Sequence, residues 1–88
     1  MNTNLIPQRD AGCVEEALEG EIVLYSASSA KAIYLNESAA LVWQLIDGER
    51  SIAQIESLLT DAYPEAVTLK DDVSQAIEVL RNHGVIHL

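Results

Sequence analysis

The chain carries few side chains that could perform chemistry. Its metal-ligating or nucleophilic candidates are Cys13, His83 and His87. The two histidines are four residues apart, a spacing that places both on one face of a continuous helix, as zinc sites use. Gly84 is expected to end the helix between them, and no third ligand is near in sequence. We therefore expect no metal site and interpret both histidines as surface or terminal residues.

Cys13 is the only cysteine. A cysteine–histidine nucleophile needs a third group to orient the base, and none is evident. We interpret Cys13 as a small, half-buried apolar residue. A chain with one cysteine has no internal disulfide, which fits the reducing cytoplasm.

Two pairs of adjacent carboxylates could suggest acid–base catalysis. Glu15 and Glu16 fall in a predicted strand, where neighbouring side chains point to opposite faces and cannot share a substrate. Asp71 and Asp72 fall in the first turn of a predicted helix, where they stabilise the positive end of its dipole. The glycines stand alone at turn positions and form no phosphate loop. We therefore expect no catalytic residue and no cofactor.

Composition narrows the function further. The 88 residues include 14 acidic and 5 basic residues, giving a net charge of −9. Nucleic-acid binding requires lysine and arginine to displace counterions, so DNA and anionic membranes are unfavourable partners. No apolar run approaches the length that spans a bilayer, and no signal-peptide pattern is present. We expect a small cytoplasmic domain, formed by residues 13–88 after a flexible arm at 1–12.

Three short segments predict an antiparallel sheet. Residues 14–18, 21–25 and 31–35 are rich in apolar, β-branched or aromatic side chains. They are separated by turn signals, at Glu19-Gly20 and at residues 27–29. Strands joined by such short turns are typical of a meander.

Three helices follow. Asn36 is a suitable N-cap for a helix over 37–47. Trp43 falls in its apolar stripe, so we expect it in the core. Gly48 suits the left-handed position after the helix. Ser51 with Gln54 forms a capping box that starts the second helix.

The second helix is expected to stop before Pro64. Thr68 and Asp71 resemble a second capping box, at the start of a third helix that Gly84 ends. The apolar tail at 85–88 is consistent with a last strand. Three helices of this length with short turns suit a helix-turn-helix core, with the sheet as its wing.

Several of these segments carry a family motif. Residues 31–48, KAIYLNESAALVWQLIDG, resemble the centre of the PqqD family, in which a strand ending in Leu-Asn precedes a helix ending in Asp-Gly. Residues 50–55 are similar to the family's second-helix start. Asp72-Val73, Leu80 and residues 84–86 are similar to its third helix and tail. The turn at 26–29 departs from the Thr-Gly pair of many relatives. The resemblance covers roughly residues 13–88.

The resemblance implies an α+β winged helix-turn-helix fold and a non-catalytic peptide chaperone. Such domains bind the leader of a ribosomally made precursor peptide by adding it as a strand to the third strand, beside the third helix. They present it to a modifying enzyme, such as a radical SAM or cyclodehydratase-type enzyme. The residues themselves add one observation, because the small side chains of Ala30 and Ala32 leave a strand edge accessible. The implied peptide-binding residues are Ala30, Lys31, Ala32, Ile33, Tyr34, Leu35, Lys70, Val73, Ser74, Ile77 and Arg81.

Within that set, Ile77 lies one step off the helix's core stripe, so we expect it to face outward toward the bound strand. Arg81, four residues on, is expected beside it. Lys70 and Arg81 could pair with acidic leader side chains. Val73 is at least as well explained as a core residue.

The sequence is also compatible with two other functions. It is compatible with a homodimer as well. A winged-helix DNA-binding regulator would place a basic stripe on the third helix, but Asp71, Asp72 and Glu78 oppose Lys70 and Arg81 there. An assembly subunit of an enzyme complex would bind no leader at all. Salt-dependent DNA retention tests the first alternative, and a short precursor gene beside this one would favour leader binding over the second.

Overall fold

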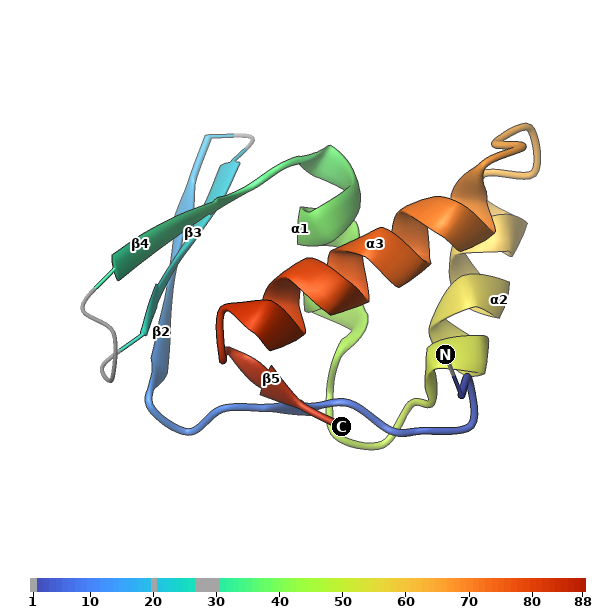
Figure 1. The fold of residues 1–88 in the computed structure, drawn as a ribbon. Coiled ribbons are helices and arrows are strands. Elements are labelled where there is room, and N and C mark those ends of the chain that lie inside the picture. Colours follow the sequence, from blue (N-terminus) through green and yellow to red (C-terminus); the bar gives the residue numbers. More distant parts are fainter. Residues whose placement is uncertain (1, 20, 27–30) are drawn as a thin grey trace.

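The computed structural model describes residues 2–19, 21–26 and 31–88. Figure 1 shows a sheet beside three helices, with the N-terminal segment passing below the helices beside β5. The predicted α+β architecture is confirmed: a three-stranded antiparallel sheet, three helices and a C-terminal strand. The elements in chain order are β1 (Gln8–Arg9), β2 (Cys13–Leu18), β3 (Glu21–Ser26), β4 (Lys31–Leu35), α1 (Glu37–Leu45), α2 (Ile52–Ala62), α3 (Leu69–Asn82) and β5 (Ile86–His87).

The main sheet has the order β2-β3-β4. Leu24, in the middle of β3, stands opposite Glu15 on one side and Ile33 on the other. Because side chains alternate along a strand, Leu24 and Ile33 face the helices, while Tyr25 and Tyr34 face outward. The expected turn residues Gly20 and 27–29 lie outside the described part of the chain.

Helix α1 begins where the sequence indicated. The Asn36 side chain accepts a hydrogen bond from the Ala39 amide at 2.8 Å. The helix ends at Leu45, however, and not at Asp47 as predicted. Ile46 is extended, and Asp47 instead accepts from the amides of Glu49 and Arg50. The turn over residues 47–50 therefore forms in place of the last two residues of the predicted helix.

Gly48 has φ +81°, the left-handed conformation expected of it. It lies within this turn and packs closely on the N-terminal segment. A Cβ at this position would come within 2.7 Å of the Gln8 side chain, which donates a hydrogen bond to the Gly48 carbonyl. Both the backbone conformation and the close approach favour glycine.

The capping box of α2 is present: Ser51 accepts from the Gln54 amide, and the Gln54 side chain accepts from the Ser51 amide. The capping box predicted for α3 from Thr68 and Asp71 is wrong. Thr68 makes no side-chain cap bond, and its hydroxyl donates to Asp72 instead, at 3.2 Å. Its backbone, with φ −102° and ψ 14°, lacks the extended conformation typical of a capping residue.

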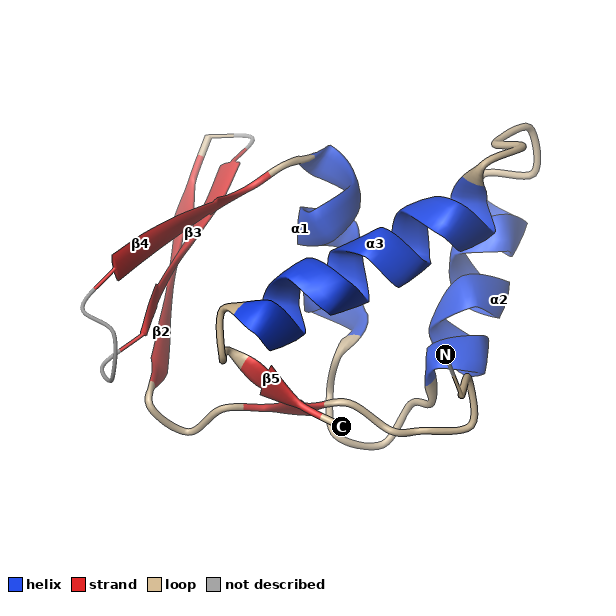
Figure 2. Ribbon diagram, viewed as in Figure 1, coloured by secondary structure: helices blue, strands red, loops and turns tan. Residues whose placement is uncertain are grey.

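The N-terminal segment, predicted to be a loose arm over residues 1–12, is bonded to the rest of the domain at several of its described residues. Gln8 and Arg9 pair with His87 and Ile86 in a second, two-stranded sheet. Upstream, the carbonyls of Thr3 and Leu5 accept from the first amides of α2. Free amides at the start of a helix are strong donors, so they attract this segment. Figure 2 shows the segment passing beneath the helices.

Arg9 connects this segment to the core through Trp43. Its guanidinium lies 4.2 Å from the centroid of the Trp43 ring and donates to the Trp43 carbonyl at 2.6 Å. The indole N–H of Trp43 donates to Glu15, which also lies 3.7 Å from Arg9. Trp43 is buried, as predicted.

The core lies between the inner face of the sheet and the three helices. Every helix and all but one of the main strands contribute fully buried side chains, and Cys13 of β2 packs half-buried against them, as predicted. Within the described residues, no helix combines the length and the apolar character needed to cross a membrane. The largest buried side chains are Trp43, Leu24, Ile46, Ile52, Ile55, Ile77, Leu80, Ile86, Val23, Val42, Val73 and Val85.

Candidate functional site

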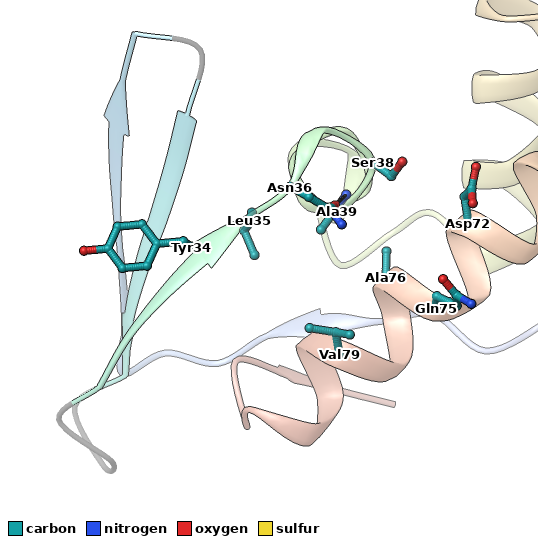
Figure 3. Close-up of a pocket in the computed structure, with 9 residues that line it drawn as sticks. All are labelled: Tyr34, Leu35, Asn36, Ser38, Ala39, Asp72, Gln75, Ala76 and Val79. Carbon is teal, nitrogen blue, oxygen red and sulfur yellow. Dashed lines mark hydrogen bonds between the residues drawn. The ribbon is translucent and has the colours of Figure 1, made fainter.

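A groove runs between β4, the start of α1 and the side of α3 (Figure 3). Among the described strands, β4 pairs only with β3, so it forms one edge of the main sheet. The groove measures about 190 Å³. We call it the β4–α3 groove, and nine residues line it: Tyr34, Leu35, Asn36, Ser38, Ala39, Asp72, Gln75, Ala76 and Val79.

Two alanines make the hollow possible. Ala39 of α1 and Ala76 of α3 are each only 5% exposed, so their methyl groups form part of the floor. Leu35 and Val79 add apolar surface at the sides, and Val79 is 43% exposed. An engineered apolar cavity of ~150 Å³ holds a benzene ring, so this groove is large enough for one large apolar side chain.

The polar groups lie around the rim. Asn36 is already engaged as the α1 cap. The Asp72 carboxylate accepts from the Thr68 hydroxyl, while the Asp72 amide donates to the Thr68 carbonyl at 2.9 Å. Figure 3 shows Asp72 beside Ser38 at one end of the groove and Val79 at the other. The result is an apolar floor with a polar, acidic end.

The predicted residues of β4 divide between its two faces. Ile33 and Leu35 are buried against the core, and Leu35 also borders the groove. Lys31 and Ala32 are exposed. Tyr34 is 75% exposed, and Figure 3 shows its ring pointing away from α3. Ala30 lies outside the described residues.

The expectation that Ile77 faces outward is wrong. Its side chain is 0% exposed and belongs to the core cluster, together with Val73. Val73, Ala76, Ile77 and Leu80 have the i, i+3, i+4, i+7 spacing of one helix face. Ile77 therefore lies inside the buried stripe and not beside it.

Lys70, Ser74 and Arg81 do not line the groove. Two residues along an α-helix correspond to a rotation of about 200°. Lys70 and Ser74 are each two positions from Asp72, and Arg81 is two positions from Val79. Lys70 and Arg81 therefore start from the opposite side of α3, whereas Ser74 borders a second surface hollow together with Gln75 and Val79. Arg81 lies 3.9 Å from Glu78 of its own helix.

Groove residues that were not predicted from the sequence lie on α3 and at the start of α1; those on α3 are Asp72, Gln75, Ala76 and Val79. A signal for α3 was present: Val79 is apolar but lies outside the helix's core stripe. Such a residue, one turn from a small residue, indicates a second apolar surface. The contribution of α1 had no sequence signal, because it depends on how β4 enters the helix.

Groups suited to chemistry are sparse. In the described ranges, no three histidine, cysteine or carboxylate residues are placed to hold a metal ion. Helix α3 ends at Asn82, and Gly84 at φ +72° turns the chain before His87. His87 Nε2 lies 2.8 Å from Asp10 Oδ1. Burial raises the pKa of the Cys13 thiol, which disfavours the nucleophilic thiolate.

The sequence model of a family described as coenzyme PQQ synthesis protein D (PqqD) matches residues 21–86. The chain belongs to the PqqD family. This match includes the whole β4–α3 groove, from Tyr34 to Val79.

Relatives in the PqqD family support the assignment. A PqqA binding protein of Pseudomonas fluorescens (strain Pf0-1) is 45% identical over 76% of this chain and 70% of its own length. A PqqA binding protein of Klebsiella pneumoniae (strain 342) is 38% identical over 74% of this chain and 67% of its own.

A solved structure has the same fold as this member of the PqqD family. It is described as TbiB1 in complex with the TbiA(beta) leader peptide. The TM-score is 0.78, with 17% identity, over 91% of this chain and 94% of the other. The likeness at this identity is one of fold.

Proposed function

We propose that the protein binds the leader segment of a ribosomally made precursor peptide of the PqqA kind. The leader adds as a strand to the edge of β4 and places a side chain in the β4–α3 groove. The observation that carries this proposal is the groove itself, an alanine-floored hollow beside a sheet edge. An edge strand offers backbone donors and acceptors, and a neighbouring pocket offers specificity.

Two comparisons support the proposal. The family relatives are named PqqA binding proteins. The chain of similar fold is described as a complex with a leader peptide. A protein of this size with such a groove fits the role of presenting the peptide to a separate modifying enzyme, of the radical SAM or another peptide-modifying type. The protein itself is then non-catalytic, and it acts in the cytoplasm, where precursor peptides are made.

The groove can be tested with Val79→Asp. Val79 is partly exposed, so the substitution should leave the fold intact while placing a charge against the apolar part of the peptide. We expect fluorescence polarisation with synthetic PqqA to show roughly tenfold or more weaker binding. Leu58→Asp is the matched control, because Leu58 of α2 is also 43% exposed but lies outside the groove.

Strand addition has its own measurement. Hydrogen exchange of the β4 amides should slow when PqqA is added, at alternate residues along the strand. Successive amides point to opposite edges, and one set already faces β3. Equal PqqA affinity of the Val79→Asp and Leu58→Asp proteins would contradict the groove. Unchanged β4 exchange in the presence of bound PqqA would contradict strand addition.

A further inference from the structure

The groove carries a charge opposite to the one that the sequence suggested. Lys70 and Arg81 were expected to meet acidic leader side chains, but both lie on the far side of α3. Of the nine residues that line the groove in the described structure, Asp72 alone carries a formal charge. The whole chain adds to this sign, with a net charge of −9.

The Asp72 carboxylate is only partly engaged. Its Oδ2 accepts from the Thr68 hydroxyl at 3.2 Å. Across the described ranges, Oδ1 receives no hydrogen bond, and no lysine or arginine forms an ion pair with Asp72. Figure 3 shows the carboxylate at the end of the groove, near Ser38. It is half-buried, so a cation brought by a ligand would be screened less than on open surface.

The spacing along α3 matches the spacing along a bound strand. Asp72 and Ala76 are four residues apart, which is a rise of about 6 Å on a helix. Side chains two residues apart on a strand point the same way and are separated by roughly 6.6 Å. A peptide side chain that rests on Ala76 therefore has its second neighbour near Asp72.

We propose that the groove selects a leader in which a lysine or arginine lies two residues from the apolar residue that enters the groove, which we call the anchor. This inference rests on the proposed function. The anchor side chain contacts Ala39 and Ala76, and the cation binds the Asp72 carboxylate. The apolar contact supplies most of the affinity. The charge pair determines which peptide binds and in which register.

A purely structural role for Asp72 is separable. Asp71 and Asp72 both lie in the first turn of α3 and both stabilise its dipole. Asp71 does not line the groove. Asp71→Asn therefore matches Asp72→Asn in net charge, in helix turn and in chemistry, but leaves the groove carboxylate in place.

The test is a selection from a displayed library of random decapeptides, carried out in parallel on the wild-type protein and on the Asp72→Asn, Asp71→Asn and Val79→Asp variants. We expect wild type and Asp71→Asn to enrich an apolar residue with a lysine or arginine two positions away. We expect Asp72→Asn to retain the apolar residue and lose the cation. Selected peptides should bind Asp72→Asn about fivefold more weakly than wild type, the effect of ~1 kcal/mol.

The outcomes distinguish the two proposals. A selection that enriches the apolar residue without a cation at that spacing, or the same cation on Asp72→Asn, overturns the charge preference and leaves groove binding intact. Peptides that are selected equally by Val79→Asp and wild type overturn groove binding itself. Equal weakening by Asp71→Asn and Asp72→Asn assigns the effect to helix stability and also overturns the charge preference.

Discussion

Arg9 joins three parts of the molecule through one side chain. It stacks on Trp43, donates to the Trp43 carbonyl and lies beside Glu15. The planar guanidinium can stack and donate at once, which an ammonium group cannot do. These Arg9 contacts hold the N-terminal segment on the domain, and no local sequence pattern predicts them.

We predict that Arg9→Lys destabilises the protein by about 1–2 kcal/mol, because it loses the stacked geometry and the fixed hydrogen bond. The change should appear as a lower midpoint in urea unfolding followed by Trp43 fluorescence. Arg81→Lys is the control, since Arg81 forms an exposed pair with Glu78 of its own helix. Equal midpoints for the two variants would show that the Arg9 contacts contribute nothing.

Asp10 gives the fold a dependence on acid. Its hydrogen bond with His87, aided by the Gly12 amide, lowers the pKa of the Asp10 carboxyl below its ordinary value. A lowered folded-state pKa contributes stability that is complete above the unfolded pKa and is lost as the pH falls through the folded one.

We therefore predict that Asp10→Asn lowers the melting temperature near pH 6, and that the difference from wild type shrinks as the pH falls below about 4. Thermal melts across pH 2.5–6 would measure it. Asp61→Asn, on the exposed surface of α2, should shift the melts little. A difference that stays constant with pH would exclude the carboxylate charge as the cause.

At the scale of elements, helix α3 has one face that packs in the core and another that borders the β4–α3 groove. One face, containing Val73 and Ile77, is buried in the core. The next face, containing Asp72 and Val79, borders the groove. The apolar periodicity identified the helix and its buried stripe. It could not say which flanking side meets β4, because that depends on how the helix is rotated against the sheet.

The two faces predict opposite outcomes for two alanine substitutions. Ile77→Ala should cost about 2–5 kcal/mol of unfolding free energy, because it leaves a cavity in the core. Val79→Ala should change stability by less than about 0.5 kcal/mol and weaken PqqA binding instead. Urea unfolding and polarisation on both variants check this. Weaker PqqA binding by folded Ile77→Ala, with Val79→Ala unaffected, would restore Ile77 to the site.

For the whole molecule, the net charge of −9 spreads repulsion over a small domain. The ion pairs Arg50–Asp47 and Arg81–Glu78 are exposed and contribute little to oppose it. Salt shortens the range of the repulsion, to a Debye length of about 10 Å at 0.1 M. The folded state gains more from this screening than the expanded one.

We predict that the melting temperature rises by about 4 °C or more between 0.01 and 0.3 M sodium chloride, which corresponds to ~1 kcal/mol for a domain of this size. Differential scanning fluorimetry would follow it, with an equal osmolarity of glycerol as the control. A melting temperature that falls with salt would mean that the surface ion pairs outweigh the repulsion.

Local sequence patterns predicted the main sheet, the three helices and the C-terminal strand, but not β1, and they identified the residues that cap α1 and α2. Asn36 and Ser51 act through bonds to amides three residues away, and the buried stripes follow the helical repeat, so local chemistry suffices for both. The strand that borders the groove was also predictable, because the Leu-Asn motif places it before α1.

Which side chains meet across elements depends on the tertiary structure. The second sheet pairs residues near opposite ends of the chain, the groove joins α1 to α3, and Arg9 stacks on Trp43. The positions of Ile77, Lys70 and Arg81 outside the groove also depend on the tertiary structure. Successive side chains on a helix are about 100° apart around its axis. A rotation of the whole helix by that angle would bring a different set of side chains against β4, although the apolar pattern of the sequence would be the same. Such contacts depend on packing, which the spacing of residues in a sequence does not contain.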